Sequence, residues 1–508
     1  MGTKKNIVKK NNYKDSVFLM EIAGKLEKKD GITSVSLMMG TPANKEILRE
    51  SNLLTVDGKA AGENDLIIAI EADTEKIITG TLKDIENFFN TDKDTQKKDV
   101  LPPTQEAALK KMKDASLALI SVPGKYAGRE TKKALDNGLN VMIFSDNVPL
   151  KEEIALKKYA DKKDLLLMGP DCGTAIIDGV PLGFANKIPG GNIGIVAASG
   201  SGLQEVTVAI AKQGAGITQA IGTGGRDLSN EVGGISMLKG LEILKNDSDT
   251  EVILLLSKPT HPQIADKILR EARKIDKPFV VCFLGSSEYE SRNNINFTST
   301  IEGAGIAAAQ LASGKEINIP KYTIDNVDQI LKKSADKIGQ GQKYIRGLFA
   351  GGTLCDEAID ILNETGINVY SNAGVSKEFK LKDSFTSVKN TLVDMGEDEF
   401  TQGRPHPMID LNLRNKRMLR ESKDDRVAVI LFDLVLGYGA NPNPAGDMAE
   451  TLQKISGKKV MVASVCGTAQ DPQNFSKQVR ILKQNGVIVL PTNAQATKFT
   501  ARIINEVN

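Results

Sequence analysis

The chain has 508 residues, 40% of them hydrophobic, and its 66 Lys and Arg residues nearly balance its 64 Asp and Glu residues. That length exceeds what one hydrophobic core organises, so we expect about three or four domains. The balanced charge does not indicate a nucleic-acid-binding protein, and no apolar run reaches the roughly 18 residues of a membrane-spanning helix. We therefore expect a protein without nucleic-acid or membrane partners.

Cysteine usage and the N-terminal residues bear on the cellular compartment. The first residues are Lys-rich and lack the apolar segment of a signal peptide. The cysteines stand singly, with no CxxC pair, which indicates neither a disulfide framework nor a zinc cluster. They are Cys172, Cys282, Cys355 and Cys466. We expect a cytoplasmic protein with no metal site, in which Cys172 and Cys355 are buried fillers.

Residues 1–90 alternate strand-like and helical patterns, with "ITSVSLMMG" and "DLIIAIEA" as the clearest strands. This alternation predicts a small α/β module of ferredoxin-like size. The stretch "TDKDTQKKDVLPP" combines a run of charges with two prolines, and it predicts a linker at 91–103.

From residue 104 onward, a pattern of strand, turn and helix repeats. Short continuous apolar runs such as "LNVMIFSD" and "EVILLLSKP" are typical of parallel strands that helices cover on both faces. A last block, from "YIRGLFAGG" through "RVAVILFDLVLGYGANPNPAG" to "GVIVLPTN", has the same plan. We interpret the two blocks as a tandem duplication of one doubly wound α/β unit, in which ligands bind at the carboxyl ends of the strands.

Two strand ends carry the same turn. "GIVAASGSGLQEV" and "GLFAGGTLCDEAIDIL" each pass from an apolar strand through small residues into a helix. A helix start offers unpaired N–H groups and a partial positive charge to an anion. A single such turn is more often only an N-cap. Two matched turns indicate that the duplicated domains face each other and hold one phosphate or acyl phosphate. The predicted contacts are Ser199, Gly200, Ser201, Gly202, Gly351, Gly352 and Thr353.

The same stretches carry a family resemblance. "MGPDCGTAIIDG", "GNIGIVAASGSGLQEVTVAI" and "GITQAIGTGGRDLSNEVGG" resemble the α subunit of succinyl-CoA synthetase and related acyl-CoA synthetases. The block from "GLFAGGTLCDEA" to the C-terminus is similar to the carboxy-terminal domain of the β subunit of that enzyme. One chain that fuses both, with a small N-terminal module and "GRPHPMID", resembles the FdrA family of acyl-CoA synthetase-like proteins.

The resemblance implies a multidomain α/β architecture. It assigns 104–188 to a partial CoA-binding Rossmann-like domain. It assigns 189–320 and 340–508 to two flavodoxin-like domains of the succinyl-CoA synthetase type. It also implies that the helices starting at Ser199–Gly202 and at Gly351–Thr353 are the two that hold phosphate.

The chain also departs from the synthetases. In those enzymes a histidine in a Gly-His-Ala-Gly setting carries the phosphoryl group, but the matching stretch "STIEGAGIAAA" has Glu302 instead. Ser257 and Lys258 stand where the glutamate that supports the phosphohistidine is expected. The Gly-rich first turn of the CoA-binding domain and an ATP-grasp domain have no counterpart. We therefore expect chemistry on a preformed acyl phosphate such as carbamoyl phosphate, with CoA a less favoured ligand.

Five further residues are candidates for the chemistry. Lys258 ends the strand "VILLLSKP" and could place a positive charge on phosphate. In the proline-bracketed loop "QGRPHPMID", Arg404 could clamp a carboxylate or phosphate. His406 could act there as general acid, general base or oxyanion donor. Arg226 in "GTGGRD" and Asn441 in "GYGANPNPAG" are candidate substrate contacts. Each also has an interpretation as an ordinary loop residue.

Three functions stay open. The resemblance links FdrA-type proteins to carbamoyl transfer between carbamoyl phosphate and oxamate in ureide breakdown, together with partner subunits. The second is an ADP-forming acyl-CoA ligase, such as a succinate–CoA ligase, that borrows an ATP-grasp partner. The third is a non-catalytic anion-sensing or scaffold subunit. We favour the first, and we expect a homo-oligomer, most simply a dimer, that binds partner enzyme subunits and a small anionic substrate.

Overall fold

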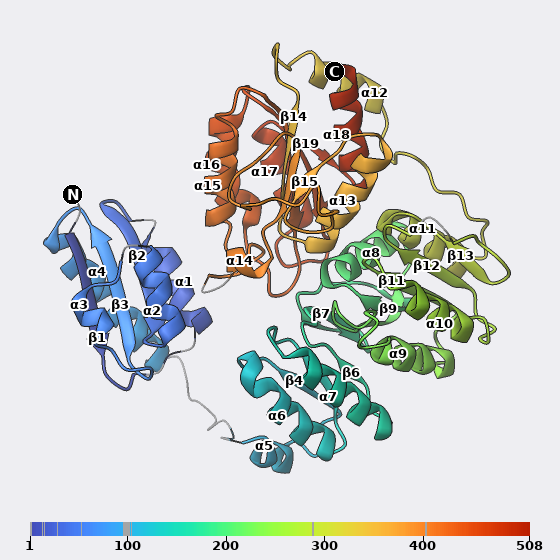
Figure 1. Ribbon diagram of the computed structural model, residues 1–508, viewed down its shortest axis with the longest axis horizontal. Helices are drawn as coiled ribbons and strands as arrows, with labels where there is room; N and C mark the ends of the chain where they lie inside the picture. The colour runs from blue at the N-terminus through green and yellow to red at the C-terminus, as the bar shows by residue number, and fades with distance from the viewer. Residues whose placement is uncertain are drawn as a thin grey trace. The chain divides into compact units, whose positions relative to one another are not determined.

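Apolar runs along the chain become the strands of four sheets in the part of the chain that the structure describes (Figure 1). The computed structural model describes residues 3–12, 14, 16–27, 29–51, 53–94, 102, 104–286, 289–401 and 404–507. They form two units: the first comprises Met1–Ala108 and Asp398–Pro405, and the second Leu109–Glu397 and His406–Asn508.

The first unit is a three-stranded antiparallel sheet of order β1-β3-β2 with helices on both faces. Alternate residues of β3 face opposite ways: Leu66 and Ile68 pack with Leu19 and Ile78, whereas Ile67 packs with residues of the other face. This confirms the small α/β module. Its elements are β1 (Thr3–Lys9), α1 (Ser16–Leu26), β2 (Ile32–Met39), α2 (Pro42–Glu50), α3 (Val56–Lys59), β3 (Leu66–Ala72), α4 (Glu75–Asp94) and α14 (Asp398–Thr401).

The predicted linker at 91–103 is only partly described. Helix α4 continues to Asp94, so the first four predicted linker residues are helical. Residues 95–101 and 103 lie outside the described residues. Helix α5 (Gln105–Lys111) follows.

The partial Rossmann-like domain is a three-stranded parallel sheet of order β4-β5-β6. The prediction placed its end at 188, but the hairpin of β7 and β8 belongs to the next sheet, because Ile176 in β7 pairs with Ala220 in β10. The elements of this domain are β4 (Leu117–Ile120), α6 (Gly124–Asp136), β5 (Asn140–Ile143), α7 (Leu150–Lys162) and β6 (Leu167–Met168), and the hairpin that joins the next sheet is β7 (Thr174–Ile177) and β8 (Val180–Gly183).

We call residues 174–312 the first lobe and residues 344–507 the second lobe. The first lobe contains the seven-stranded sheet, of order β13-β12-β11-β9-β10-β7-β8. Strands β9 to β13 are parallel within it, and β9 lies between β10 and β11. The elements are β9 (Gly190–Ala198), α8 (Gly200–Lys212), β10 (Ile217–Gly222), α9 (Ile235–Asn246), β11 (Val252–Ser257), α10 (Pro262–Ala272), β12 (Phe279–Phe283), β13 (Ile295–Phe297) and α11 (Ile301–Ala312). Helix α12 (Val327–Ala335) follows and packs against the last helix of the chain, α18 (Asn493–Val507).

The second lobe is a six-stranded parallel sheet of order β15-β16-β14-β17-β18-β19. It repeats the arrangement of the first, because β14 also lies between two parallel strands and leads directly into a helix. The elements are β14 (Tyr344–Phe349), α13 (Gly352–Glu364), β15 (Tyr370–Ser371), β16 (Thr391–Asp394), α15 (Asn412–Glu421), β17 (Val427–Val435), α16 (Pro444–Ile455), β18 (Val460–Cys466), α17 (Phe475–Gln484), β19 (Val487–Leu490) and α18 (Asn493–Val507).

The two lobes share one apolar core. Helix α8 packs against α11 of its own lobe and against α13 of the second lobe, and α13 in turn packs against α18 (Figure 1). Buried Leu203 and Val206 of α8 lie in the same cluster as Leu354 of α13 and Phe499 of α18. This core fixes the starts of α8 and α13 relative to each other. No helix among the described residues combines the length and the apolar character needed to cross a membrane.

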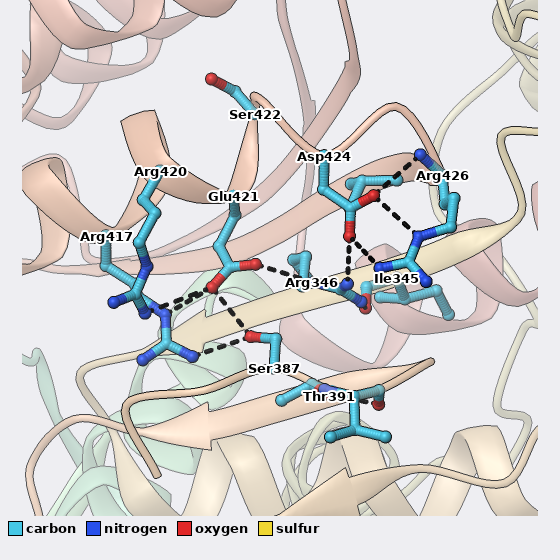
Figure 2. A network of polar contacts seen from close by, with 12 residues as sticks. Ile345, Arg346, Ser387, Thr391, Arg417, Arg420, Glu421, Ser422, Asp424 and Arg426 are labelled. Carbon is cyan, nitrogen blue, oxygen red and sulfur yellow. Dashed lines mark hydrogen bonds and ion pairs between the residues drawn. The ribbon is translucent and has the colours of Figure 1, made fainter. Parts of the chain in front are cut away.

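A buried ionic network secures the second lobe at the side away from the carboxyl ends of its strands (Figure 2). Arg346 of β14 is 1% exposed and donates to Glu421 at 2.8 Å and to Asp424 at 3.1 Å. Arg417 and Ser387 also donate to Glu421, at 2.6 and 2.8 Å. Burial opposes ionisation of Glu421, but these partners outweigh it and lower the pKa of Glu421. The network therefore ties α15 and two loops to the sheet.

We predict that Arg346→Met lowers the free energy of unfolding by about 3–5 kcal/mol, because it leaves the buried Glu421 carboxylate short of a partner. Arg420→Met, which removes a neighbouring but exposed arginine, should change it by no more than about 0.5 kcal/mol. Urea denaturation followed by circular dichroism measures both. Equal stability of the two variants would contradict the assignment of a structural role to the network.

Candidate active site

Helix α8 begins where β9 ends, at Ser199. This residue has extended backbone, with φ −165° and ψ 126°, and its Oγ accepts the Gly202 N–H at 3.0 Å. The arrangement is that of an N-cap, which satisfies one of the free N–H groups of the helix start. The local pattern of small residues after an apolar strand therefore has the predicted structural outcome.

Helix α13 begins in the same way after β14, but a distant carboxylate replaces the capping side chain. Gly351 occupies the N-cap position without a side-chain hydrogen bond. The N–H groups of Ala350 and Gly351 donate to the two carboxylate oxygens of Asp433, at 2.8 and 2.7 Å. Asp433 lies in β17, is fully buried, and accepts from Arg414 at 2.9 Å. The protein thus places its own anion beside this helix start.

The two helix starts meet. The hydroxyls of Ser199 and Thr353 are 2.6 Å apart, although the residues are 154 positions apart in the chain. The Thr353 N–H also donates to Ser201 Oγ at 3.2 Å. Ser199 is 5% exposed and Thr353 is 2% exposed. The expected convergence of the two turns is present, and we call the residues at these helix starts, 199–202 and 351–353, the cradle.

Glycine is required where the helix starts approach. A Cβ on Gly202 would overlap Ser199 Oγ and lie 3.1 Å from Thr353 Cγ2. A Cβ on Gly351 would lie 2.9 Å from the Cβ of Ser201. The hydroxyls of Ser199 and Ser201 already accept the Gly202 and Thr353 N–H groups. Both N–H groups therefore have serine hydroxyls as partners, and an anion in the cradle would have to replace these hydroxyls as acceptor.

Lys258 lies beside the cradle, as predicted from its position after β11. Its Nζ pairs with Asp356 Oδ2 at 2.9 Å and lies 3.3 Å from the point that a Cβ on Gly352 would occupy. Burial opposes its charge, but Asp356 and Asp394 prevail and raise the pKa of Lys258 above its ordinary value. Lys258 therefore stays a cation next to the start of α13.

His406 also faces this region. Its ring centroid lies 5.7 Å from that of Phe184, and its Nδ1 accepts the Met408 N–H at 3.2 Å. Burial, with a smaller effect of Arg414, lowers the pKa of His406 to about 4. An accepting Nδ1 on a neutral ring leaves the proton on Nε2, which packs against Gly396. Of the roles predicted for His406, the structure favours the donor over the general base.

Asp394 was missed by sequence reasoning. It is the last residue of β16, is 3% exposed, and contacts Gly352 at the start of α13. Burial raises its pKa to about 7. The signal was present, since "TLVDMG" is an apolar strand that ends in a carboxylate, and the carboxyl ends of parallel strands form the ligand edge.

Two predicted substrate contacts are engaged elsewhere. Arg226 pairs with Glu153 at 2.9 Å and donates to Val148 O at 2.8 Å, so it ties the loop after β10 to the partial Rossmann-like domain. Asn441 Nδ2 donates to Ile409 O at 3.0 Å and to Asp447 at 3.1 Å, which uses both of its hydrogens. Neither side chain is presented to the cradle, and Asn441 instead orders the loop after His406.

Arg404 belongs to the first unit, together with α14. Its N–H donates to Thr401 O at 2.9 Å. Gln402 and Gly403 of the same loop lie outside the described residues. The clamp that we predict for Arg404 therefore stays a prediction.

Glu302 and the cysteines are buried. Glu302 is 3% exposed and accepts from Gln495 of α18, and burial raises its pKa. Burial raises the pKa of the Cys172 thiol to about 12 and that of Cys355 well above its ordinary value. Both thiols therefore suit packing rather than nucleophilic catalysis. The described residues contain no group of His, Cys, Asp and Glu side chains arranged to hold a metal ion.

Three family models match the chain. They are described as "CoA-ligase" at 348–503, "CoA binding domain" at 190–285, and "AllF, heavy metal-associated domain" at 1–105. The CoA-binding match begins at β9 and so lies in the first lobe, whereas the resemblance assigns the CoA-binding-like domain to 104–188.

The name of the third family implies a heavy metal in the first unit. Such metals are held by Cys and His ligands, but residues 1–105 contain neither. The residues present therefore do not fit a heavy-metal site.

The chain is similar to known proteins over different lengths. It is 42% identical to the uncharacterised protein YahF of Escherichia coli (strain K12), over 98% of each chain. It is 26% identical to the α subunit of the ADP-forming succinate–CoA ligase of Aquifex aeolicus (strain VF5), over 42% of this chain and 71% of that subunit. An ATP citrate lyase structure from Methanothrix soehngenii matches 45% of each chain at 16% identity, with a TM-score of 0.36.

We predict that His406 titrates with a midpoint near 4. The folded protein then holds fewer protons than the unfolded chain, in which the pKa is 6.5. The stability that comes from the neutral ring is complete above pH 6.5 and is lost as the pH falls towards 4. Nuclear magnetic resonance of ¹⁵N-labelled histidine measures the midpoint and the tautomer, with His261→Gln to assign the signal. A midpoint at or above 6.5, or a proton on Nδ1, would contradict the donor role.

Proposed function

Because the chain belongs to the FdrA family of acyl-CoA synthetase-like proteins, we propose that it transfers a carbamoyl or related acyl group from an acyl phosphate. The phosphate group binds in the cradle between α8 and α13. The acceptor is a small acid or amide such as oxamate, and partner subunits complete the enzyme.

The observation that carries this proposal is the 2.6 Å contact between Ser199 and Thr353. It brings two positively polarised helix starts to one point. Each helix dipole stabilises an anion by about 0.3–1 kcal/mol, and by up to about 2 kcal/mol when partly buried. Hydrogen bonds from N–H groups to the charged phosphate add to this. A phosphate group satisfies both helix starts at once.

The charges around the cradle suit a transfer reaction. The acceptor attacks the carbonyl carbon of the acyl phosphate, and the carbon–oxygen bond to the phosphate then breaks. Lys258 offsets the charge that grows on the departing phosphate. The neutral His406 donates from Nε2 to the carbonyl oxygen as it becomes an oxyanion. Donors that are already in place stabilise this charge without reorganisation.

Glu302 favours a preformed acyl phosphate over ATP. A phosphoryl group taken from ATP needs a residue to carry it, and the position of the carrier histidine holds a buried glutamate bonded to Gln495. An acyl phosphate brings its phosphate already attached to the group to be transferred. It therefore needs the cradle but no phosphohistidine.

A second candidate is an acyl-CoA ligase that works with a nucleotide-binding partner subunit. The matches to the CoA-ligase and CoA-binding families at 348–503 and 190–285 favour it. An acid-labile phosphoenzyme formed from ATP would support this function over the first.

The direct test measures phosphate release by the protein together with the subunits that co-purify with it. We expect release from carbamoyl phosphate that depends on oxamate, with formation of the carbamoylated product. We expect none that depends on ATP, CoA and succinate. The opposite pattern would establish the ligase, and release in neither mixture would refute both enzymatic proposals for these substrates.

We predict that Lys258→Gln weakens phosphate binding by about 10- to 100-fold. A hydrogen bond to a charged group contributes about 1.5–3 kcal/mol, and each 1.4 kcal/mol is tenfold in affinity. Isothermal titration calorimetry with inorganic phosphate measures the change. Lys267→Gln is the control, since Lys267 donates to Gly233 O on the first lobe, outside the cradle. Equal phosphate affinities of the two variants would show that Lys258 does not contribute to phosphate binding.

A further inference from the structure

Hydrogen bonds hold Asp394 in a fixed orientation beside the cradle, and the transfer proposed above gives this residue no role. Asn372 bonds its backbone in both directions, because Asn372 Nδ2 donates to Asp394 O and the Asp394 N–H donates to Asn372 Oδ1, each at 2.9 Å. The Gly396 N–H donates to Asp394 Oδ1 at 2.8 Å. These three hydrogen bonds fix both the main chain and one carboxylate oxygen.

The other oxygen, Oδ2, faces the cradle. It lies against Gly352 so closely that a Cβ there would overlap it, and the same Cβ would be 3.3 Å from Lys258 Nζ. Gly352 is the first residue of α13. Lys258 Nζ and Asp394 Oδ2 therefore both lie close to the start of α13, where a ligand atom could reach the two together.

The surroundings of Asp394 set its protonation. Burial is the main influence and raises its pKa to about 7. Lys258 acts in the opposite direction, the carboxylates of Glu397 and Asp356 act in the same direction as burial, and the Gly396 N–H favours ionisation. On β17, which β14 separates from β16, Asp433 is paired with Arg414. A carboxylate balanced in this way can both accept and return a proton near neutral pH.

The other two candidates at the site do not offer a basic lone pair. Lys258 is a cation paired with Asp356, and its pKa is raised. Nδ1 of His406 is occupied by the Met408 N–H, and its Nε2 carries the proton. Asp394 Oδ2, by contrast, is an oxygen acceptor directed at the helix start.

We propose that Asp394 is the catalytic base that takes the proton from the nitrogen of the acceptor, an inference that rests on the proposed transfer function. As Oδ2 removes the N–H proton, the nitrogen lone pair forms a bond to the carbonyl carbon, and the carbonyl π electrons move to its oxygen. The oxyanion then collapses, the carbon–oxygen bond to phosphate breaks, and its electron pair leaves with the phosphate. Asp394 passes its proton to that phosphate, so protons and charge balance and the carboxylate is restored.

The test compares Asp394→Asn with the wild type, each as the complex with its co-purifying subunits. We expect carbamoyl transfer from carbamoyl phosphate to oxamate to fall about 10²- to 10⁴-fold, the usual contribution of a general base. Sulfate, a dianion throughout this pH range, is the binding probe. Its affinity at pH 8 should be unchanged or higher in Asp394→Asn, because the variant removes a negative charge but keeps the shape.

Asp360→Asn is the matched control. Asp360 lies further along α13 and also has a raised pKa, to about 6 through burial, but it is remote from the helix start. We expect its transfer rate to stay within about twofold of the wild type. The wild-type kcat/KM should fall as the pH drops below about 7, since Asp394 is then protonated. Asp394→Asn should lack this dependence.

Each result has a distinct meaning. If the wild-type complex transfers no carbamoyl group, both the proposed function and the proposal that Asp394 is the catalytic base are wrong. If the wild type is active and Asp394→Asn stays within about tenfold of it, only the base is overturned. Loss of sulfate binding in Asp394→Asn would show that Asp394 has a structural role, and it would also overturn the proposal that Asp394 is the catalytic base. Should Asp394→Asn not fold, a wild-type profile that is flat between pH 6 and 8 would overturn the proposal, and an acid limb near 7 would support it.

Discussion

The structure depends on the meeting of two helix starts at one point. Like ends of helix dipoles repel, so this arrangement needs a force that holds α8 and α13 together and groups that offset their partial charges. The force is the apolar core shared by both lobes, in which Leu203 of α8 and Leu354 of α13 belong to one buried cluster. The contact between Ser199 and Thr353 is the polar end of that interface.

The offsetting groups are carboxylates placed near the starts of helices. Asp433 accepts the Ala350 and Gly351 N–H groups before α13, and Glu357 accepts the Ile301 N–H at 2.8 Å at the start of α11. Burial raises the pKa of Glu357 to about 7, which is also the value for Asp394. The protein therefore compensates the starts of α13 and α11 with buried carboxylates of its own.

Local features of this architecture could be predicted from the sequence, and non-local ones could not. Both helix starts were found because the strand, the small residues and the helix are adjacent in the chain. The small first module and the two parallel lobes were also recognisable from short apolar runs. The predicted domain boundary at 188 differs from the structure because the β7–β8 hairpin pairs with β10, and no local sequence pattern indicates this contact.

The same difference between local and non-local contacts explains which site residues could be predicted from the sequence. Lys258 follows a buried strand and lies at the edge where such residues gather. Arg226 also follows a strand, but Glu153, from a different domain, pairs with it. Asn441 serves the neighbouring loop rather than a ligand. The position of Asp394 at a strand end was recognisable in "TLVDMG", but its orientation comes from Asn372, 22 residues earlier in the chain. Partners such as these become visible only when the chain is folded.

The central claim is that one phosphate group bridges the two helix starts. The most direct measurement is a crystal structure of the protein with inorganic phosphate bound. The account predicts one phosphate whose oxygens lie about 2.7–3.2 Å from backbone nitrogens of both α8 and α13. A phosphate bound to only one of these helices, or bound elsewhere while both starts keep their serine contacts, would contradict it.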